Sequence, residues 1–256
     1  MSEPAEASPS PELSIVVPAM NEQDNVGPLV EQVRQAIVET GIDAELIVVD
    51  DGSTDSTLSE LMALAKRYPW LRPLHRERSM GQSAAMHAGI QAATGRYIAM
   101  LDADLQNDPT DLPALLEPVR TGHADMVQGD RSEHRCDTII RRASSWVGRT
   151  VRRLLLGDTI RDTGCTARVV KASIAKQYPL QFKGMHRYLP VYAKMLGARV
   201  IELPVNHRPR AAGAAKYGIL NRGPSGLVDC LAVRWMLRRY RDPAAGPPNA
   251  REQDNA

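Results

Sequence analysis

Short apolar runs rich in Val and Ile alternate with longer amphipathic stretches along the first half of the chain. Runs of this kind between turn residues are typical of buried strands, whereas apolar residues at helical spacing predict helices. The pattern predicts strands over residues 13–18, 46–50, 71–75 and 97–101. It predicts helices between them, over residues 26–39, 56–67 and 82–94.

The second half of the chain is less regular. It predicts strands over residues 126–131 and 198–204, and helices over residues 139–156 and 225–241. Strands that alternate with helices form a mostly parallel sheet with helices on both faces. We therefore predict a single α/β domain over residues 13–241. A leader (1–12) rich in Pro and Ser and a tail (242–256) of similar composition are predicted to be disordered.

Composition narrows the class of protein. Apolar residues make up 43% of the chain, but no run approaches the roughly 18–20 residues of a membrane-spanning helix. The leader lacks the basic and apolar regions of a signal peptide. The three cysteines fit neither a zinc site nor a disulfide framework. These features predict a cytoplasmic protein with reduced thiols.

Arginines are concentrated over residues 131–153 and 234–241, although the net charge is only +2. A basic surface on a nearly neutral chain favours a phosphate-bearing partner over nucleic acid. The two predicted helices in these regions combine arginines with an apolar stripe that contains Trp, a pattern typical of a helix at a membrane interface. In 225–241 the stripe is Leu227, Val228, Leu231, Ala232, Trp235 and Met236, with Arg234, Arg238 and Arg241 on another face. Packing of each stripe on the domain itself is an equally good interpretation, so peripheral attachment to the inner face of a membrane is a hypothesis.

Three predicted strands end in polar loops, at Pro18–Glu22, Asp50–Asp55 and Asp102–Gln106. The carboxyl ends of parallel strands meet at one edge of a sheet, where ligands bind. Asp102 and Asp104 offer hard oxygen ligands for Mg²⁺ or Mn²⁺. A solvated acidic turn is the alternative for an isolated Asp-X-Asp, but its place after a buried strand favours the metal site.

Asp50 and Asp51 suit a ribose hydroxyl or a base N–H at the end of the second strand. The same residues, followed by Gly52, also make a good turn and helix cap. The chain contains neither a dinucleotide-binding glycine motif nor a Walker phosphate loop, which argues against dinucleotide enzymes and P-loop NTPases.

Seven segments in a fixed order carry a family resemblance: IVVPAMNE, IVVDDGSTD, RSMGQSAAMHAG, YIAMLDADLQNDP, VQGDR, RDTGCTAR and PVNHRPRAAGAAKYG. Together they resemble the family 2 inverting glycosyltransferases with a GT-A fold. Within that family the chain is similar to the branch of dolichol-phosphate mannosyltransferase and related polyprenyl-phosphate glycosyltransferases. The resemblance implies a nucleotide-sugar half (13–130) and an acceptor half (131–241).

The resemblance also implies residue roles. Five residues would line the nucleoside site: Pro18, Asn21, Glu22, Asp50 and Asp51. Asp102 would contact the nucleotide sugar, and Asp104 and Gln106 would hold the Mg²⁺ or Mn²⁺. Three basic residues would bind phosphates: Arg131, Arg210 and Lys216. Met20 stands where the family often has Tyr, and Ala215 stands where a Ser commonly precedes the Lys.

We expect transfer of a hexose from a GDP- or UDP-sugar to a polyprenyl phosphate with inversion, with GDP-mannose as the first choice of donor. A UDP-sugar donor, or a polysaccharide or soluble acceptor, is the alternative. A lipid phosphate is already an anion at neutral pH and needs positive charge rather than a strong base. An ordinary hydroxyl needs a general base, for which Asp162 is the candidate. Asp162 could equally anchor an arginine such as Arg168.

Overall fold

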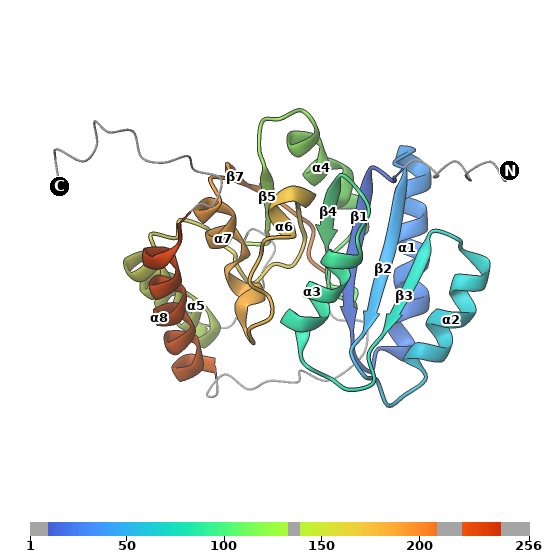
Figure 1. Cartoon of the computed structure of the whole chain (residues 1–256), viewed down its shortest axis with the longest axis horizontal. Helices are drawn as coiled ribbons and strands as arrows, with labels where there is room; N and C mark the ends of the chain where they lie inside the picture. The colour runs from blue at the N-terminus through green and yellow to red at the C-terminus, as the bar shows by residue number, and fades with distance from the viewer. Residues whose placement is uncertain (1–9, 133–138, 209–221, 242–256) are drawn as a thin grey trace, which may run out of the picture.

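A central β-sheet organises the molecule, in a computed structural model that describes residues 10–132, 139–208 and 222–241. Within these residues the sheet has seven strands in the order β3-β2-β1-β4-β6-β5-β7 (Figure 1). The strands are β1 (Leu13–Ala19), β2 (Ala44–Asp50), β3 (Leu71–His75), β4 (Tyr97–Met100), β5 (Met126–Asp130), β6 (Arg168–Lys171) and β7 (Val200–Pro204). Only β6 runs antiparallel to its neighbours, β4 and β5. The predicted mostly parallel α/β fold is confirmed.

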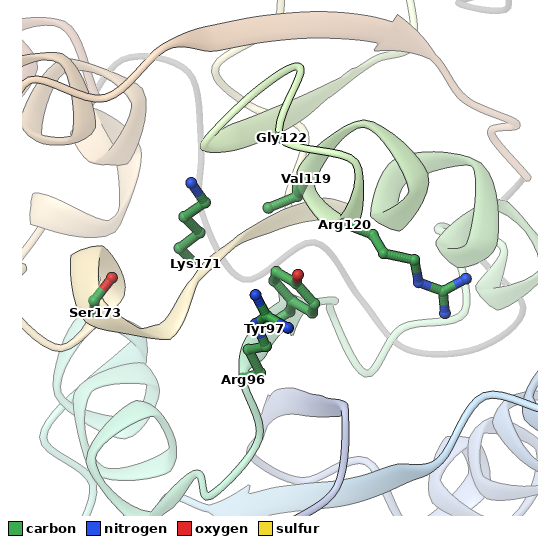
Figure 2. Close-up of a pocket in the computed structure, with 7 residues that line it drawn as sticks. All are labelled: Arg96, Tyr97, Val119, Arg120, Gly122, Lys171 and Ser173. Atoms are coloured by element: carbon green, nitrogen blue, oxygen red, sulfur yellow. The ribbon is translucent and has the colours of Figure 1, made fainter.

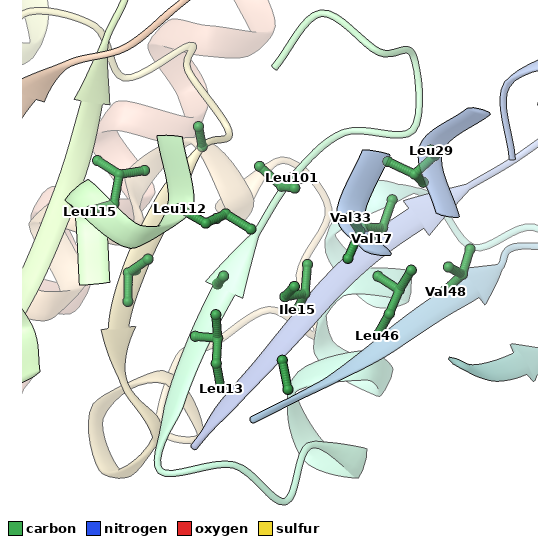
Figure 3. Close-up of a cluster of buried hydrophobic side chains, with 14 of the residues drawn as sticks. Leu13, Ile15, Val17, Leu29, Val33, Leu46, Val48, Leu101, Leu112 and Leu115 are labelled. Atoms are coloured by element: carbon green, nitrogen blue, oxygen red, sulfur yellow. The ribbon is translucent and has the colours of Figure 1, made fainter. Parts of the chain in front are cut away.

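Helices cover both faces of the sheet because its central strands are apolar on both sides. One face carries α1 (Gln23–Thr40), α2 (Thr57–Arg67) and α4 (Leu112–Arg120). On that face Ile15 and Val17 of β1 belong to one buried cluster with Leu29 of α1 and Leu115 of α4 (Figure 3). The alternation of strand side chains sends Val16 to the opposite face.

The opposite face carries α3 (Gln82–Ala92), α6 (Ala172–Ala175) and α7 (Leu189–Met195). Short 3-10 turns, η1 (Pro109–Asp111) and η2 (Met185–Tyr188), precede α4 and α7. Helix α3 lies very close to the sheet, because a Cβ added at Gly89 would be 2.4 Å from Val16 Cγ1 and 3.0 Å from Val49 Cγ2. Glycine is therefore the residue that permits this approach.

The helices α5 (Ile139–Leu156) and α8 (Arg222–Arg239) pack side by side at one end of the molecule (Figure 1). The Arg234 guanidinium of α8 donates a hydrogen bond to the Leu155 carbonyl of α5 at 2.8 Å. Cys230 and Val233 point from α8 into the core. The pair thus completes the buried cluster on the face of the sheet that carries α3, α6 and α7.

Most of the apolar stripe predicted on α8 faces outward, whereas Met236 at its end packs against the core. Leu227, Val228, Leu231 and Trp235 are between 48% and 65% exposed, while Cys230 and Val233 are buried. Arg238 is exposed as well, so the outward side of α8 carries both apolar and basic side chains. Helix α8 is therefore apolar on two faces, and among the described residues only one of these faces is covered.

Most predicted elements lie within a few residues of their observed bounds. The strand β6 and the helices α4, α6 and α7 were not predicted. The tail (242–256), most of the leader, Arg210 and Lys216 lie outside the described residues. Among the described residues, no helix is both long and apolar enough to cross a bilayer.

Candidate active site

Several polar loops meet at the carboxyl edge of the sheet, as predicted. Ala19 at the end of β1 pairs with Asp50 at the end of β2. Pro18 pairs with Val49 within the same ladder, so it lies one residue short of the edge. Because β6 is antiparallel, its first residue, Arg168, pairs with the last residue of β4. The edge therefore receives the ends of parallel strands and the beginning of β6.

Asp50 is fully buried and bridges two strands. Its Oδ2 lies 2.8 Å from His75 Nδ1 at the end of β3, and its Oδ1 accepts a hydrogen bond from the Ser53 amide at 3.1 Å. The carboxylate therefore holds the turn after β2 against the neighbouring strand. Its contact with a nucleoside stays a prediction.

Asp51 holds the loop that leads into α3. Its Oδ2 accepts hydrogen bonds from the Ser79 hydroxyl and the Gly81 amide, both at 2.8 Å, and the Met80 amide donates to it at 3.2 Å. Gly52 has a φ of 72°, and a Cβ there would lie 2.6 Å from the Ser79 nitrogen. The glycine allows this close approach, and Asp51 fixes the wall of the predicted nucleoside site.

Asn21 and Glu22 join the loop after β1 to the loop after β2. Asn21 has a φ of 52° and accepts a hydrogen bond from the Thr54 amide at 2.8 Å. The Asn21 amide donates to the Ser53 hydroxyl at 2.9 Å. The Glu22 backbone amide donates to the Thr57 hydroxyl at the start of α2 at 2.8 Å, and the Glu22 carboxylate accepts from the Asn25 side chain at 2.6 Å. The structure therefore brings the predicted nucleoside residues together in one bonded pair of loops.

The Asp102 carboxylate is held from two sides. Its Oδ1 accepts from the Gln82 amide at 2.9 Å, and its Oδ2 accepts from the Thr166 hydroxyl at 2.7 Å. Burial and the nearby Asp104 carboxylate raise the pKa of Asp102 to about 6, although the Thr166 hydrogen bond acts in the opposite direction. Asp102 therefore titrates close to neutral pH.

The loop after Asp102 is tightly wound. The buried Asp104 accepts a hydrogen bond from the Gln106 amide at 3.2 Å, and the Arg208 amide donates to the Gln106 carbonyl at 3.0 Å. Leu105 between them has a φ of 62°, a left-handed conformation that costs about 1–2 kcal/mol for a side chain with a Cβ. Such a conformation persists only where the surrounding structure fixes it.

The residues of this loop fit a divalent cation. Asp102 and Asp104 lie close enough for one charge to raise the pKa of the other, and carboxylate oxygens are the ligands that Mg²⁺ and Mn²⁺ prefer. Gln106 is partly exposed beside them. In the described part of the chain, no group of three or more His, Cys, Asp or Glu residues is arranged to hold a metal ion by itself. A cation held by the carboxylates of Asp102 and Asp104 would keep coordination positions for the oxygens of a bound diphosphate.

Arg131 and Asp162 form an ion pair beside this loop. Arg131 Nε and Nη2 donate to the two Asp162 oxygens at 2.7 and 3.1 Å. Arg168, the alternative partner expected for Asp162, instead donates to the carbonyls of Thr166 and His186 at 3.3 and 3.4 Å. The anchored arginine is therefore Arg131. With both oxygens accepting from a guanidinium, Asp162 is poorly placed to remove a proton from an acceptor.

Two residues of the site were missed from the sequence, Gln82 and Thr166. Both lie in segments that carry the family resemblance, but neutral amide and hydroxyl groups give no charge signal. Their contacts with Asp102 depend on the placement of α3 and β6. The two basic residues expected to accompany Arg131, Arg210 and Lys216, fall outside the described residues.

A hollow of about 430 Å³ lies at the opposite edge of the sheet (Figure 2). It is lined by Arg96, Tyr97, Val119, Arg120, Gly122, Lys171 and Ser173. Arg120 pairs with Glu12 at 2.7 Å, and Lys171 pairs with Asp125 at 2.5 Å. Two of the three basic residues that line this hollow are thus paired with carboxylates, which makes it a poor site for a phosphate. The candidate active site lies at the carboxyl edge instead.

Comparison with known proteins gives consistent matches. A family model described as "Glycosyl transferase family 2" matches residues 14–178. A dodecaprenyl-phosphate galacturonate synthase from Rhizobium johnstonii is 39% identical over 230 residues, which are 89% of this chain and 68% of the relative. An undecaprenyl-phosphate 4-deoxy-4-formamido-L-arabinose transferase from Edwardsiella ictaluri is 33% identical over 210 residues, 81% of this chain and 63% of the relative. The chain thus spans about two thirds of the length of these curated relatives.

Solved structures of glucosyl-3-phosphoglycerate synthase from Mycobacterium tuberculosis share the fold. The complex with Mn²⁺, uridine diphosphate and phosphoglyceric acid has a TM-score of 0.68 at 21% identity, over 93% of this chain and 82% of that chain. The complex with Mg²⁺ and uridine diphosphate has a TM-score of 0.65 at 20% identity, over 88% and 79%. The likeness confirms the predicted GT-A-type architecture.

Proposed function

Because the chain belongs to glycosyl transferase family 2, we propose that it transfers a sugar from a uridine-diphosphate sugar to a polyprenyl phosphate. The observation that carries the proposal is the pair of the half-buried Asp102 and the buried Asp104 beside Arg131 at the carboxyl edge of the sheet. Carboxylates suit a divalent cation, and an arginine suits a phosphate. Together they match the diphosphate of a nucleotide sugar.

The relatives favour a uridine donor over the first choice of GDP-mannose. The two curated relatives are named for galacturonate and for 4-deoxy-4-formamido-L-arabinose, not for mannose. Two of the solved structures that share the fold, those with Mn²⁺ and with Mg²⁺ described above, contain uridine diphosphate. We therefore propose the alternative donor, a UDP-sugar, with galacturonate or a similarly modified sugar as the transferred group.

The ion pair between Arg131 and Asp162 supports a phosphate acceptor. Attack of an acceptor phosphate oxygen on the anomeric carbon forms one C–O bond, while the bond from that carbon to the diphosphate breaks with inversion. Uridine diphosphate leaves with the electron pair. No proton has to be removed from a phosphate that is already ionised, so Asp162 can serve to position Arg131 instead of acting as a base. When bound at Asp102 and Asp104, Mg²⁺ or Mn²⁺ supplies positive charge for the leaving diphosphate.

The outward face of α8 supports a lipid acceptor and a peripheral position at a membrane. Helices α5 and α8 contain nine arginines, five and four respectively, and a single carboxylate, Asp229. The exposed side chains of Leu227, Val228, Leu231 and Trp235 all lie on α8. Exposed apolar side chains on an arginine-rich pair of helices suit the boundary between the acyl chains and headgroups of an anionic leaflet. The inner face of the membrane, in the cytoplasm, is the proposed location.

A transfer assay tests the proposal. Purified protein with Mn²⁺ is given UDP-galacturonate, UDP-glucose or GDP-mannose, each with undecaprenyl phosphate or with 3-phosphoglycerate, and the products are identified by mass spectrometry. We expect a sugar-phosphate lipid from a UDP-sugar and none from the Asp104→Asn variant. Transfer from GDP-mannose alone would overturn the donor assignment. Transfer to 3-phosphoglycerate alone would overturn the lipid acceptor.

A further inference from the structure

The loop from Asp102 to Asn107 contains the proposed metal-binding residues, and its two ends are linked by one side chain from a distant segment. The Thr166 hydroxyl donates to Asp102 Oδ2 at 2.7 Å and accepts from Asn107 Nδ2 at 2.7 Å. Thr166 and Asn107 are both buried, at 6% and 4% exposure. A single hydroxyl therefore forms hydrogen bonds with the side chains of both the first and the last residue of the loop.

The loop needs such a link because its backbone is not relaxed. Leu105 lies inside it with a φ of 62°, which a leucine adopts only when neighbouring contacts compensate. The Asp104 carboxylate and the Arg208 amide hold the middle of the loop through Gln106. Only the Thr166 hydroxyl, among the described residues, bonds to both Asp102 and Asn107.

The direction of β6 explains how Thr166 reaches this position. Because β6 runs antiparallel to β4, the residues just before it arrive at the edge where β4 ends. Thr166 thus meets Asp102 from the side opposite to Gln82, which comes from the start of α3. The Asp102 carboxylate is therefore hydrogen-bonded by two segments that are far apart in the sequence, the start of α3 and the residues before β6.

We propose that Thr166 is a positioning residue that fixes the Asp102–Asn107 loop in the conformation that receives the diphosphate and its metal. This inference deepens the proposed function, on which its ligand-binding consequence rests. Without the hydroxyl, the buried Asn107 side-chain amide loses its acceptor, and among the described residues Gln82 is the one hydrogen-bond donor left to Asp102. The strained loop then samples other conformations, and Asp102 and Asp104 are no longer held at a fixed separation.

The test compares Thr166→Val with Thr166→Ser and Thr163→Val. Valine has nearly the shape of threonine without the hydroxyl, and serine keeps the hydroxyl. Thr163 is the matched control, because it lies in the same segment at the same 6% exposure and its side chain makes no hydrogen bond within the described residues. The first measurement is hydrogen exchange of the peptide that spans residues 101–108, without ligand. The second is the affinity for uridine diphosphate with Mn²⁺, by calorimetry.

We expect Thr166→Val to speed exchange of this peptide roughly tenfold or more and to weaken binding by a similar factor, as loss of hydrogen bonds to a charged group implies. Thr166→Ser and Thr163→Val should stay within about threefold of the wild type. Unchanged exchange in Thr166→Val, or equal acceleration in Thr163→Val, would overturn the inference. If Thr166→Val speeds exchange but the wild type does not bind uridine diphosphate, the positioning role stands and the proposed donor fails.

Discussion

The Asp102 carboxylate experiences opposing influences within a few ångströms. Burial and the neighbouring Asp104 raise its pKa to about 6, while the Thr166 hydroxyl and the Arg168 and Arg131 guanidinium groups act to lower it. The carboxylate must be ionised to bind a metal. A fall in pH from about 7 to below about 6 therefore removes the negative charge of Asp102 that a metal ion requires.

We predict that affinity for Mn²⁺ with uridine diphosphate falls as the pH drops through about 6, by about tenfold per unit at lower pH. Calorimetry at pH 7.5, 6 and 5 measures this affinity.

The protonated form of Asp102 is favoured in the folded state, so the stability that this proton contributes is present below about pH 4 and is lost as the pH rises through about 6. Asp102→Asn should thus melt at a higher temperature than the ligand-free wild type at pH 7.5. A lower melting temperature would contradict the prediction.

Charged residues of the site could be predicted from the sequence, whereas their partners could not. Asp102 and Asp104 stand out because carboxylates directly follow a buried strand. Nothing in the sequence pairs Asp162 with Arg131 rather than Arg168, because that choice depends on where β5 and β6 place the side chains. Neutral residues such as Thr166 are predictable only once the strand order is known.

Elements with a clear period were predicted, and short or unusual ones were not. The strand β6 has four residues and begins with the buried Arg168, so it lacks the apolar run that reveals β1 or β2. The helix α4 contains Pro113 and Pro118, which mask it because proline usually marks the end of a helix. Pro113 is at the first turn, where its missing N–H is no loss. Tertiary packing against the sheet decides both elements.

The contact between α3 and the sheet gives a prediction at this scale. Gly89→Ala places a methyl group against Val16 and Val49 and should lower the free energy of unfolding by about 1–3 kcal/mol through overpacking. Gly148→Ala in the exposed part of α5 is the matched control, since a Cβ there meets nothing within 4 Å. It should raise stability by about 0.5–1 kcal/mol. Urea denaturation measures both; equal effects of the two substitutions would contradict the close packing of α3.

The whole molecule has its proposed catalytic edge and its exposed apolar helix on a single α/β domain. Figure 1 shows α8 at one end and α2 at the other, with the sheet between them. The predicted convergence of the three polar loops is observed, because parallel strands fix it once their order is known. The outward direction of the α8 stripe was not predictable, since both faces of that helix are apolar.

We predict that the protein binds vesicles of phosphatidylglycerol at low salt through α8. Replacing Leu231 and Trp235 by Ser should weaken binding at least tenfold, because each apolar side chain contributes about 1.5–3 kcal/mol when buried. Met62→Ser on α2 is the control, because Met62 is 50% exposed at the far end of the molecule. Co-sedimentation measures the bound fraction. Equal binding by all three proteins would remove the role of α8, and absence of wild-type binding would remove the membrane proposal.

The position of β6 in the sheet also governs how the chain assembles. The strands β1 to β4 pair among themselves, and β5 pairs with β7, but β6 alone joins the two sets. As the ribosome delivers the chain, β4 therefore remains an open edge until residues 168–171 have emerged. An open apolar edge is a template for pairing with other chains. The strand β6, once it has entered the sheet, thus both completes the proposed catalytic edge and covers the open edge of β4.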